Sequence, residues 1–258
     1  MKIAGRSLGT ILRAPFQAPH YIAAANMLRL YVEPVDAYAR YLLGSGDYPV
    51  TIEVRSPTGP VRLVAYSRHD MLTINEVFCR ADYRASEADK VVVDLGSNIG
   101  VSAAYFLSRS PDVFAYLFEP LPMNVVRLES NLRPFEGRYQ LVQLAVGLQE
   151  GEVEFGWEET GRYGGIGQPT GRYVTVKCVD SNGVLSSIIE RHSQIDILKI
   201  DIEGLEKAVV EHISPKLARR IRTIYAECRY SGAHPLRETH DYRQYGSIAH
   251  FTRRLHVA

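Results

Sequence analysis

From Lys90 onward, short apolar runs alternate with longer stretches of helical pattern, and this alternation most constrains the fold. The apolar runs are VVVDL at 91–95, VFAYLFE at 113–119, YQLVQLAV at 139–146, IDILKI at 195–200 and IRTIYAEC at 221–228. Candidate covering helices lie between or after them, at 103–108, 123–132, 184–192 and 205–217. Strands and helices that alternate in this way form a mostly parallel sheet with helices on both faces. The sequence therefore predicts an α/β domain over residues 86–258.

The chain before this region has a different pattern. Apolar residues recur at near-helical intervals over 21–43, and Pro34 is expected to divide this stretch into two helices. Residues 48–67 alternate apolar and polar side chains around the turn sequence SPTG, which predicts a hairpin. HDMLTINEVFCR at 69–80 predicts a short helix. We therefore expect residues 1–85 to form a helical and hairpin extension packed on the core.

Composition excludes several classes of partner. The formal net charge is +1, so no long-range field draws the chain to nucleic acid or to an anionic membrane. The three cysteines, Cys79, Cys178 and Cys228, are widely spaced and form no CxxC motif, which argues against a disulfide framework and a zinc site. No run reaches the roughly 18 apolar residues of a membrane helix, and arginines interrupt any signal-peptide core. We expect a cytoplasmic protein.

The sequence DLGSNIG, at residues 94–100, follows the first predicted parallel strand. Ligands of parallel-sheet proteins bind beyond the carboxyl ends of the strands, and the first strand-to-helix turn is the usual cradle. Gly96 and Gly100 let the backbone approach a ligand closely, and Asn98 tolerates positive φ better than most residues. The turn is thus a candidate ligand site.

The charge of Asp94 indicates the kind of ligand. A dinucleotide site would read GxGxxG and would bring pyrophosphate close to this carboxylate, so a nicotinamide-dependent oxidoreductase is the less favoured alternative. S-adenosylmethionine carries a sulfonium and an ammonium group and removes the conflict. Glu119 ends the second strand, where an acidic side chain can accept both hydroxyls of a ribose. The pair predicts an S-adenosylmethionine site.

With DLGSNIG, FEP, LKIDIEGLE and YAEC in this order, residues 48–228 resemble the FkbM-type methyltransferases, a branch of the class I S-adenosylmethionine-dependent fold. The resemblance implies a Rossmann-like sheet and O-methylation of a hydroxyl on a sugar or natural-product acceptor. It also places residues 144–146 near the adenine. By this similarity the cofactor-binding residues would be Asp94, Gly96, Ser97, Asn98, Gly100, Glu119 and Ala145.

Transfer of a methyl group to a hydroxyl oxygen requires a base or a metal ion that removes the acceptor proton. Asp201, Glu203 and Glu227 lie at or just beyond the ends of the fourth and fifth predicted strands and are the candidate catalytic residues. Asp201 and Glu203 together could bind Mg²⁺, or one could act as a base alone. Two structural alternatives stay open. Asp201 could cap the next helix while Glu203 complements its dipole, and Lys199 could form an ion pair with Asp201.

Two further segments carry expectations. The glycine-rich stretch 156–171 lies between two predicted strands and is interpreted as a lid over the acceptor. Only 30 residues follow Cys228, and they contain no convincing apolar strand. We expect a solvated tail rich in His and Arg. The last edge of the sheet is then unusual or is supplied by a partner in a homo-oligomer. If the tail folds over the site instead, His234 or His240 could serve as the base.

A non-catalytic protein that binds S-adenosylmethionine and serves in an assembly is the alternative from another functional class. It would keep the cofactor residues and make no use of the acidic ones. Asp201 is the residue at which the two hypotheses differ.

Overall fold

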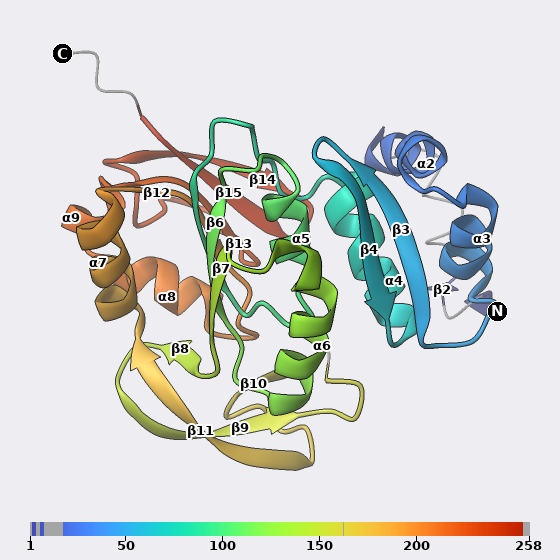
Figure 1. Ribbon diagram of the computed structural model, residues 1–258. Coiled ribbons are helices and arrows are strands. Elements are labelled where there is room, and N and C mark those ends of the chain that lie inside the picture. Colours follow the sequence, from blue (N-terminus) through green and yellow to red (C-terminus); the bar gives the residue numbers. More distant parts are fainter. Residues whose placement is uncertain (1, 4–5, 8–17, 162, 255–258) are drawn as a thin grey trace. The chain divides into compact units, whose positions relative to one another are not determined.

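The computed structural model describes residues 2–3, 6–7, 18–161 and 163–254. The chain divides into two compact units, Met1–Arg84 and Ala85–Ala258. Figure 1 shows their secondary structure, coloured from blue at the N-terminus to red at the C-terminus. We describe each unit by itself.

The first unit contains helices and two antiparallel pairs of strands, of which the longer pair is the predicted hairpin. Pro34 lies at the start of α3, where its missing N–H is not needed, and so separates α2 from α3. Ser67 and Asp70 form a reciprocal capping box that starts α4. The elements are β1 (Lys2–Ile3), β2 (Arg6–Ser7), α2 (Ala18–Leu30), α3 (Pro34–Tyr38), the π-helix η2 (Ala39–Leu43), β3 (Val50–Ser56), β4 (Gly59–Ala65), α4 (Arg68–Ile74) and the π-helix η3 (Asn75–Arg80).

The second unit is built on a seven-stranded sheet in the order β14-β15-β13-β12-β5-β6-β7. The five strands from β13 to β7 are parallel, and β15 runs antiparallel to both of its neighbours, β13 and β14. The strands are β5 (Val91–Leu95), β6 (Phe114–Phe118), β7 (Tyr139–Val142), β12 (Ile195–Ile200), β13 (Ile221–Ala226), β14 (His240–Tyr245) and β15 (Ile248–Arg253). This is the mostly parallel sheet that the sequence predicted.

Helices cover both faces of this sheet, as Figure 1 shows. One face carries α5 (Val101–Leu107) and α6 (Pro122–Leu132), and the other carries α7 (Ser181–His192), α8 (Glu206–His212) and α9 (Pro215–Ala218). Every residue of β5 and β12 is buried, because both faces of a central parallel strand are covered. The continuous apolar runs in the sequence have this cause.

A second sheet, in the order β10-β9-β11-β8, holds the glycine-rich stretch. The predicted strand 139–146 is in fact two strands: a tight turn, in which the Leu144 N–H donates to the Val142 carbonyl, separates β7 from β8 (Ala145–Gly147). The chain there leaves the first sheet and pairs in parallel with β11. The other strands are β9 (Gly151–Trp157), β10 (Gly164–Ile166) and β11 (Arg172–Asp180).

The expectation of a solvated C-terminal tail is wrong. β14 and β15 form a hairpin that completes the sheet from within this chain, and Phe251 is fully buried in the core. His240 and His250 are buried as well. The ring of His250 packs against the rings of Tyr225 and Tyr245. These contacts accommodate a polar residue in β15, which lies between two other strands of the sheet. His256 lies outside the described residues.

Candidate active site

Main-chain hydrogen bonds bring the carboxyl ends of the parallel strands together. The N–H groups of Gly96 and Ser97 both donate to the Phe118 carbonyl at 3.0 Å, which joins the turn after β5 to the end of β6. On the other side, the Asp201 N–H donates to the Leu95 carbonyl at 3.0 Å. The residues predicted from β5, β6 and β12 therefore lie along one edge of the sheet.

The turn after β5 has a left-handed backbone at three positions, including Asn98, whose tolerance of this conformation the sequence predicted. Gly96, Asn98 and Gly100 all have positive φ, at 81°, 49° and 86°. A Cβ on Gly96 would lie 1.9 Å from the Asp201 carbonyl oxygen, so only glycine fits where the ends of β5 and β12 approach. A Cβ on Gly100 would press on Leu128 of α6.

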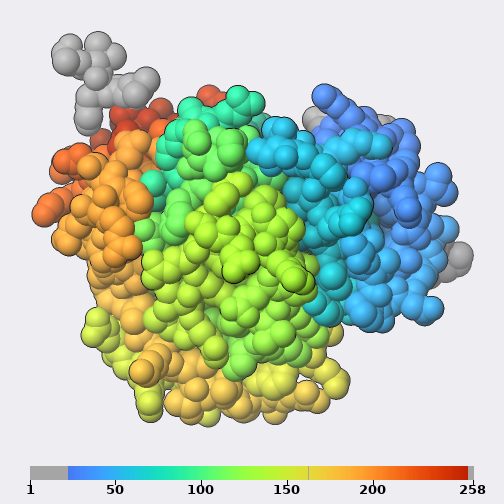
Figure 2. Space-filling model, in the orientation of Figure 1, coloured from blue at the N-terminus to red at the C-terminus, as the bar shows by residue number. Residues whose placement is uncertain are grey.

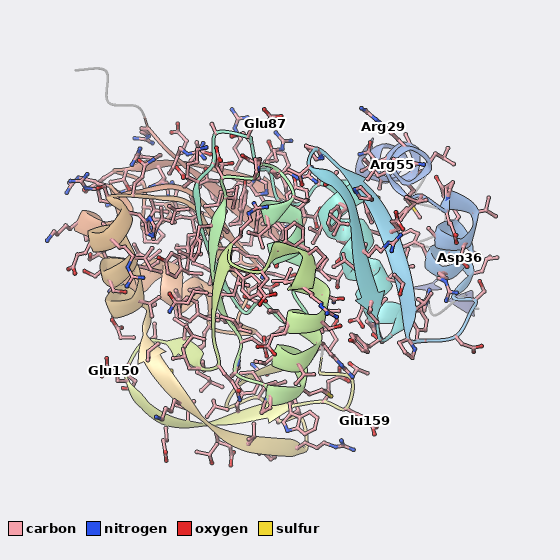
Figure 3. The ribbon with its side chains drawn as sticks, viewed as in Figure 1. Arg29, Asp36, Arg55, Glu87, Glu150 and Glu159 are labelled. Carbon is pink, nitrogen blue, oxygen red and sulfur yellow. The ribbon has the colours of Figure 1, made fainter. Side chains whose placement is uncertain are left out.

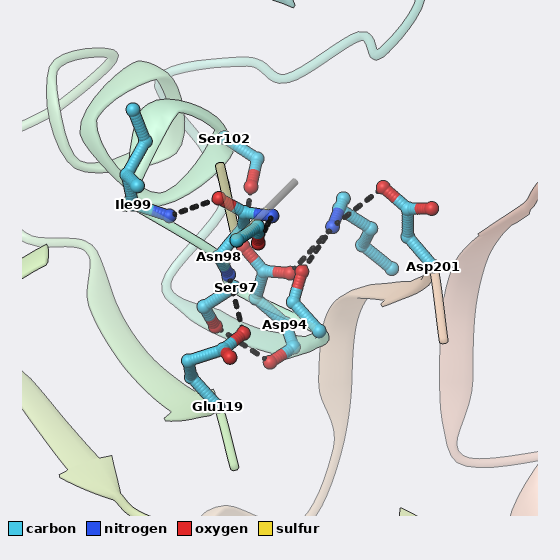
Figure 4. A network of polar contacts seen from close by, with 10 residues as sticks. Asp94, Ser97, Asn98, Ile99, Ser102, Glu119 and Asp201 are labelled. Atoms are coloured by element: carbon cyan, nitrogen blue, oxygen red, sulfur yellow. Dashed lines mark hydrogen bonds and ion pairs between the residues drawn. The ribbon is translucent and has the colours of Figure 1, made fainter. Parts of the chain in front are cut away.

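Figure 4 shows a polar network at this edge around Asp94, Ser102 and Asp201. Lys199 is its centre. Its Nζ donates to Asp94 Oδ1 at 2.9 Å and to the Gly96 carbonyl at 3.0 Å, and it lies 3.3 Å from Asp201 Oδ2. The second oxygen of Asp94 accepts from the Ser102 hydroxyl at 2.6 Å. Lys199 thus holds the turn, the end of β5 and the end of β12 in one arrangement. The expected ion pair with Asp201 is present.

Burial and pairing act in opposite directions on these charges. Burial raises the pKa of Asp94, while Lys199 and Ser102 counteract this. Burial also opposes a charge on Lys199, but the carboxylates of Asp94 and Asp201 outweigh it and raise its pKa. We take both groups of the buried pair as charged, because each has a partner in hydrogen-bond contact.

Asp94 does not offer its carboxylate to a ligand directly. The residue is 0% exposed, and both of its oxygens have partners inside the protein. Its charge therefore acts on the site through Lys199 and Ser102. The open negative charge is that of Asp201, whose side chain is 32% exposed. Because two carboxylates share one lysine, the edge keeps a surplus negative charge, which suits a cationic ligand.

Glu119 is buried just after β6 and is held by three donors. Its Oε2 accepts from the Asn98 N–H at 2.9 Å, and its Oε1 accepts from the Leu121 N–H at 3.0 Å and from Asn124 Nδ2 at 3.2 Å. Burial raises the pKa of Glu119 to about 7, against the effect of these donors. A carboxylate offers about four acceptor positions, so the three donors leave capacity for a ligand hydroxyl.

The other predicted cofactor residues differ in their surroundings. Ser97 is buried, and its hydroxyl donates to the Asp94 carbonyl at 2.9 Å, so it supports the turn. Asn98 is partly exposed, and its Oδ1 accepts from the Ile99 N–H at 2.7 Å. Ala145 is buried in β8, within the second sheet. Of these three, Asn98 is the one whose side chain stays accessible.

The acidic candidates lie after β12 and β13. The Glu227 N–H donates to the Ile200 carbonyl at 3.3 Å, which brings the two strand ends together, and the Glu227 side chain is exposed. Glu203 has a left-handed backbone, with φ of 27°. Neither Asp201 nor Glu203 caps α8, because that helix begins at Glu206 after Leu205, without a side-chain cap.

Glu206 is an acidic residue that the sequence did not single out. It is buried in the first turn of α8, and its carboxylate accepts from the Gly204 N–H at 3.0 Å. Burial raises its pKa, and the charges of Asp201 and Glu227 raise it further. The only signal for it was its place at the end of LKIDIEGLE. In the part of the chain that the structure describes, no three His, Cys, Asp or Glu side chains are grouped to hold a metal ion.

Asn124 is the second residue that sequence reasoning missed. It is buried in the first turn of α6, and its amide contacts both Glu119 and the carbonyl of Gly161, in the glycine-rich stretch. The sequence shows it only as a polar residue near the start of a predicted helix. Its role depends on a tertiary contact that no local pattern reveals.

Comparison with known proteins agrees with this geometry. The model of the methyltransferase FkbM domain matches residues 94–249, which is more than half of the chain. The chain is 28% identical over 169 residues to the 2-O-methyltransferase NoeI of Sinorhizobium fredii, covering 58% of this chain and 69% of that protein. It is 40% identical over 83 residues to the AMB antimetabolite synthetase AmbE of Pseudomonas aeruginosa, covering 31% of this chain and 4% of that protein.

Among solved structures, an O-methyltransferase family protein from Burkholderia thailandensis aligns with a TM-score of 0.40 and 11% identity, over 74% of this chain and 57% of that one. None of the described helices has both the length and the apolar character needed to span a bilayer. The extent of the family match is decisive, and the chain belongs to the FkbM methyltransferase family.

Proposed function

We propose that this protein transfers a methyl group from S-adenosylmethionine to a hydroxyl oxygen of a sugar or a small natural product. One observation carries the proposal: Asp201 keeps an accessible carboxylate at the edge where Lys199 already neutralises Asp94. The surplus negative charge suits a positively charged methyl donor. The named activity of the relative NoeI, a 2-O-methyltransferase, supports an oxygen acceptor.

The cofactor would lie against the turn 96–100, with Glu119 accepting a hydrogen bond from a ribose hydroxyl. When bound, it supplies a methyl group on a positively charged sulfur. Gly96 and Gly100 let the backbone approach the cofactor closely, and Asn98 is partly exposed beside it. Asp94 and Ser97 act indirectly, through the hydrogen bonds that shape the turn. Ala145, at the start of β8, would lie near the adenine of the cofactor.

The acceptor oxygen must approach the methyl carbon opposite the sulfur and must lose a proton. We assign removal of this proton to one of the carboxylates that follow β12 and β13. Asp201 is the first candidate, because it directly follows β12 beside the turn 96–100 and Lys199 orients its side chain. Glu203 and Glu227 flank it. Glu206 is the further candidate, since a carboxylate of raised pKa is the stronger base.

All of these residues lie in residues 86–258, to which we assign the catalytic activity. A divalent cation such as Mg²⁺, held by Asp201, Glu203 and acceptor oxygens, is the alternative way to promote loss of the proton. Turnover measured with and without a chelator distinguishes the two: a metal-dependent reaction stops, whereas a carboxylate base continues.

The proposal is tested by incubating the protein with isotopically labelled S-adenosylmethionine and candidate acceptors, followed by mass spectrometry of the products. Titration calorimetry first establishes cofactor binding. Asp201→Asn should leave cofactor binding measurable and should lower turnover at least about a hundredfold, the typical contribution of a general base. The matched control is Glu150→Gln, because Glu150 points into solvent from the turn before β9 (Figure 3).

Two outcomes would contradict the proposal. A protein that binds no S-adenosylmethionine at millimolar concentration is not a methyltransferase of this kind. A protein that binds it, but turns over every acceptor at the same background rate as Asp201→Asn, would instead be the non-catalytic binding protein.

A further inference from the structure

Asn124 joins the end of β6 to a segment nearly forty residues further along the chain. Its Nδ2 donates to Glu119 Oε1 at 3.2 Å and to the Gly161 carbonyl at 2.8 Å. The side chain is buried, so neither hydrogen bond is exchanged easily for one to water. One amide group thus contacts both the proposed ribose acceptor and the glycine-rich stretch.

The turn around Gly161 is held from several directions. Gly161 has a φ of 77°, and a Cβ there would lie 2.6 Å from Asn124 Oδ1, so the close approach requires glycine. Asn98 Nδ2 also reaches the Gly161 carbonyl, at 3.4 Å. Arg127, one turn after Asn124 on α6, donates to the Thr160 carbonyl at 2.7 Å. The carbonyls of Thr160 and Gly161 therefore accept hydrogen bonds from side chains of α6 and of the turn after β5, where the cofactor is proposed to bind.

The same stretch contacts the acidic half of the site a few residues later. Gln168 Nε2 donates to the Glu203 carbonyl at 3.4 Å. A Cβ on Gly165 would lie 2.7 Å from that carbonyl oxygen, so the two backbones are in close contact. We call residues 158–161 and 163–168 the bridge segment, because their contacts connect the turn after β5 with the loop after β12.

The pictures agree with this placement. In Figure 1, β9, β10 and β11 lie beyond the ends of β6 and β7 and beside α6. In Figure 2, the yellow atoms of this region form a continuous surface with the green atoms of α6. Contacts to Asn124, Arg127 and Glu203 hold the bridge segment against the site, and we call this arrangement closed.

We propose that Asn124 is a positioning residue that holds the bridge segment closed and couples its closure to the contact between Glu119 and the cofactor. The proposal rests on the function proposed above. A ligand hydroxyl that donates to Glu119 favours the carboxylate form, and a carboxylate accepts a stronger hydrogen bond from Asn124. That bond fixes the amide in the orientation that reaches Gly161. Coupling of this kind is reciprocal, so closure must also strengthen cofactor binding.

Hydrogen exchange measures closure directly. S-adenosylhomocysteine serves as the probe, because it keeps the ribose and transfers no methyl group. In the native protein, the probe should slow amide exchange in peptides covering residues 155–170. In Asn124→Ala, the probe should still bind, but exchange in the bound state should be about tenfold faster, as expected for the loss of one buried hydrogen bond. Asn124→Ser is the second variant if Asn124→Ala does not fold.

Asn131→Ala is the matched control. Asn131 is also buried on α6, and its amide donates to the Ile99 carbonyl at 2.9 Å rather than to the bridge segment. Its loss should lower overall stability, but the probe should still slow exchange over 155–170. If Asn131→Ala abolishes this protection as fully as Asn124→Ala does, the effect is general destabilisation and the proposal is overturned.

A second readout separates Asn124 from the other anchor. The groups that lower the pKa of Glu119 are the Leu121 N–H, Asn124, the Asn98 N–H and Lys199. Asn124→Ala removes one of them, so the pH midpoint of probe affinity should move upward. Arg127→Ala loosens the bridge segment at Thr160 without contact to Glu119 and should leave the midpoint unchanged.

The outcomes are distinguishable from failure of the proposed function. If the native protein does not bind the probe, the proposed function fails. If it binds the probe, and Asn124→Ala shows native protection and a native pH midpoint, the proposed function stands and the role of Asn124 is refuted.

Discussion

Lys199 Nζ lies 2.9 Å from Asp94 Oδ1, and the two residues are direct neighbours in the register of β12 and β5. Neighbours in register on adjacent strands point to the same face of a sheet. The DLGSNIG and LKIDIEG sequences, more than a hundred residues apart, are thus joined by one buried ion pair. The pair neutralises Asp94 and leaves Asp201 as the accessible charge.

Lys199→Met should destabilise the protein strongly. The substitution leaves the carboxylate of Asp94 buried without its partner, which costs about 3–5 kcal/mol in other proteins. Denaturant unfolding followed by circular dichroism measures the loss. Lys207→Met removes a lysine from an exposed pair with Glu211 and should change stability by less than about 1 kcal/mol.

The double variant Lys199→Met/Asp94→Asn decides the cause. Because it removes the charge as well as its partner, it should recover part of the stability lost in Lys199→Met. A double variant as unstable as the sum of the two single variants would mean that the pair contributes no specific interaction.

Gly96→Ala should prevent the native approach of β5 and β12. Gly96 and Gly137 have nearly the same φ, 81° and 80°, but a Cβ meets the Asp201 carbonyl at 1.9 Å in the first case and nothing within 4 Å in the second. Gly137→Ala therefore costs only the left-handed conformation, about 1–2 kcal/mol. Gly96→Ala should cost clearly more and should also abolish cofactor binding. Equal stability of the two variants would contradict the crowding seen at Gly96.

The sequence predicted the elements of the core well, because apolar runs and helical spacing are local signals of burial on both faces. The positive φ of Asn98 agrees with its predicted tolerance of that conformation, since positive φ restricts the residue type. The pairing of Asp94 with Lys199 was missed. Strand order and register decide it, and neither is a local property.

The hairpin of β14 and β15 was missed for a related reason. β15 reads IAHFTR, in which a histidine interrupts the apolar run, and its burial depends on contact with Tyr225 of β13. Glu206 and Asn124 were missed because each is a polar residue at the start of a helix, where exposure is the usual expectation. In both cases tertiary packing buries a residue whose local sequence predicts a solvated one.

Glu119 should make the cofactor-free protein less stable as the pH rises. Burial raises its pKa from 4.5 to about 7, so folding favours the protonated form. The stabilisation is complete below pH 4.5 and is lost as the pH rises through 7, by about 3 kcal/mol in all. Unfolding of the native protein and of Glu119→Gln, compared from pH 4 to 8, measures this. The difference between the two should depend on pH; a constant difference would show that Glu119 titrates normally.

His240 should produce the opposite dependence at lower pH. It is buried; its Nε2 lies 3.0 Å from the Ile221 carbonyl, and its Nδ1 lies 2.8 Å from the Thr239 hydroxyl. Burial lowers its pKa from 6.5 to about 4, helped by the charges of Arg253 and Arg254. Its contribution is therefore complete above pH 6.5 and is lost as the pH falls through 4, by about 3 kcal/mol.

The comparison of the native protein with His240→Gln between pH 7 and 4 isolates this contribution. The native protein should lose its stability advantage over the variant as the pH falls, because the buried imidazole must take up a proton. His69→Gln, at an exposed histidine of the first unit, is the control for removal of an imidazole. If the segment after Cys228 were a solvated tail, His240→Gln would behave like His69→Gln at every pH. A pH-dependent difference confined to His240→Gln would instead confirm that the C-terminal hairpin is part of the folded core.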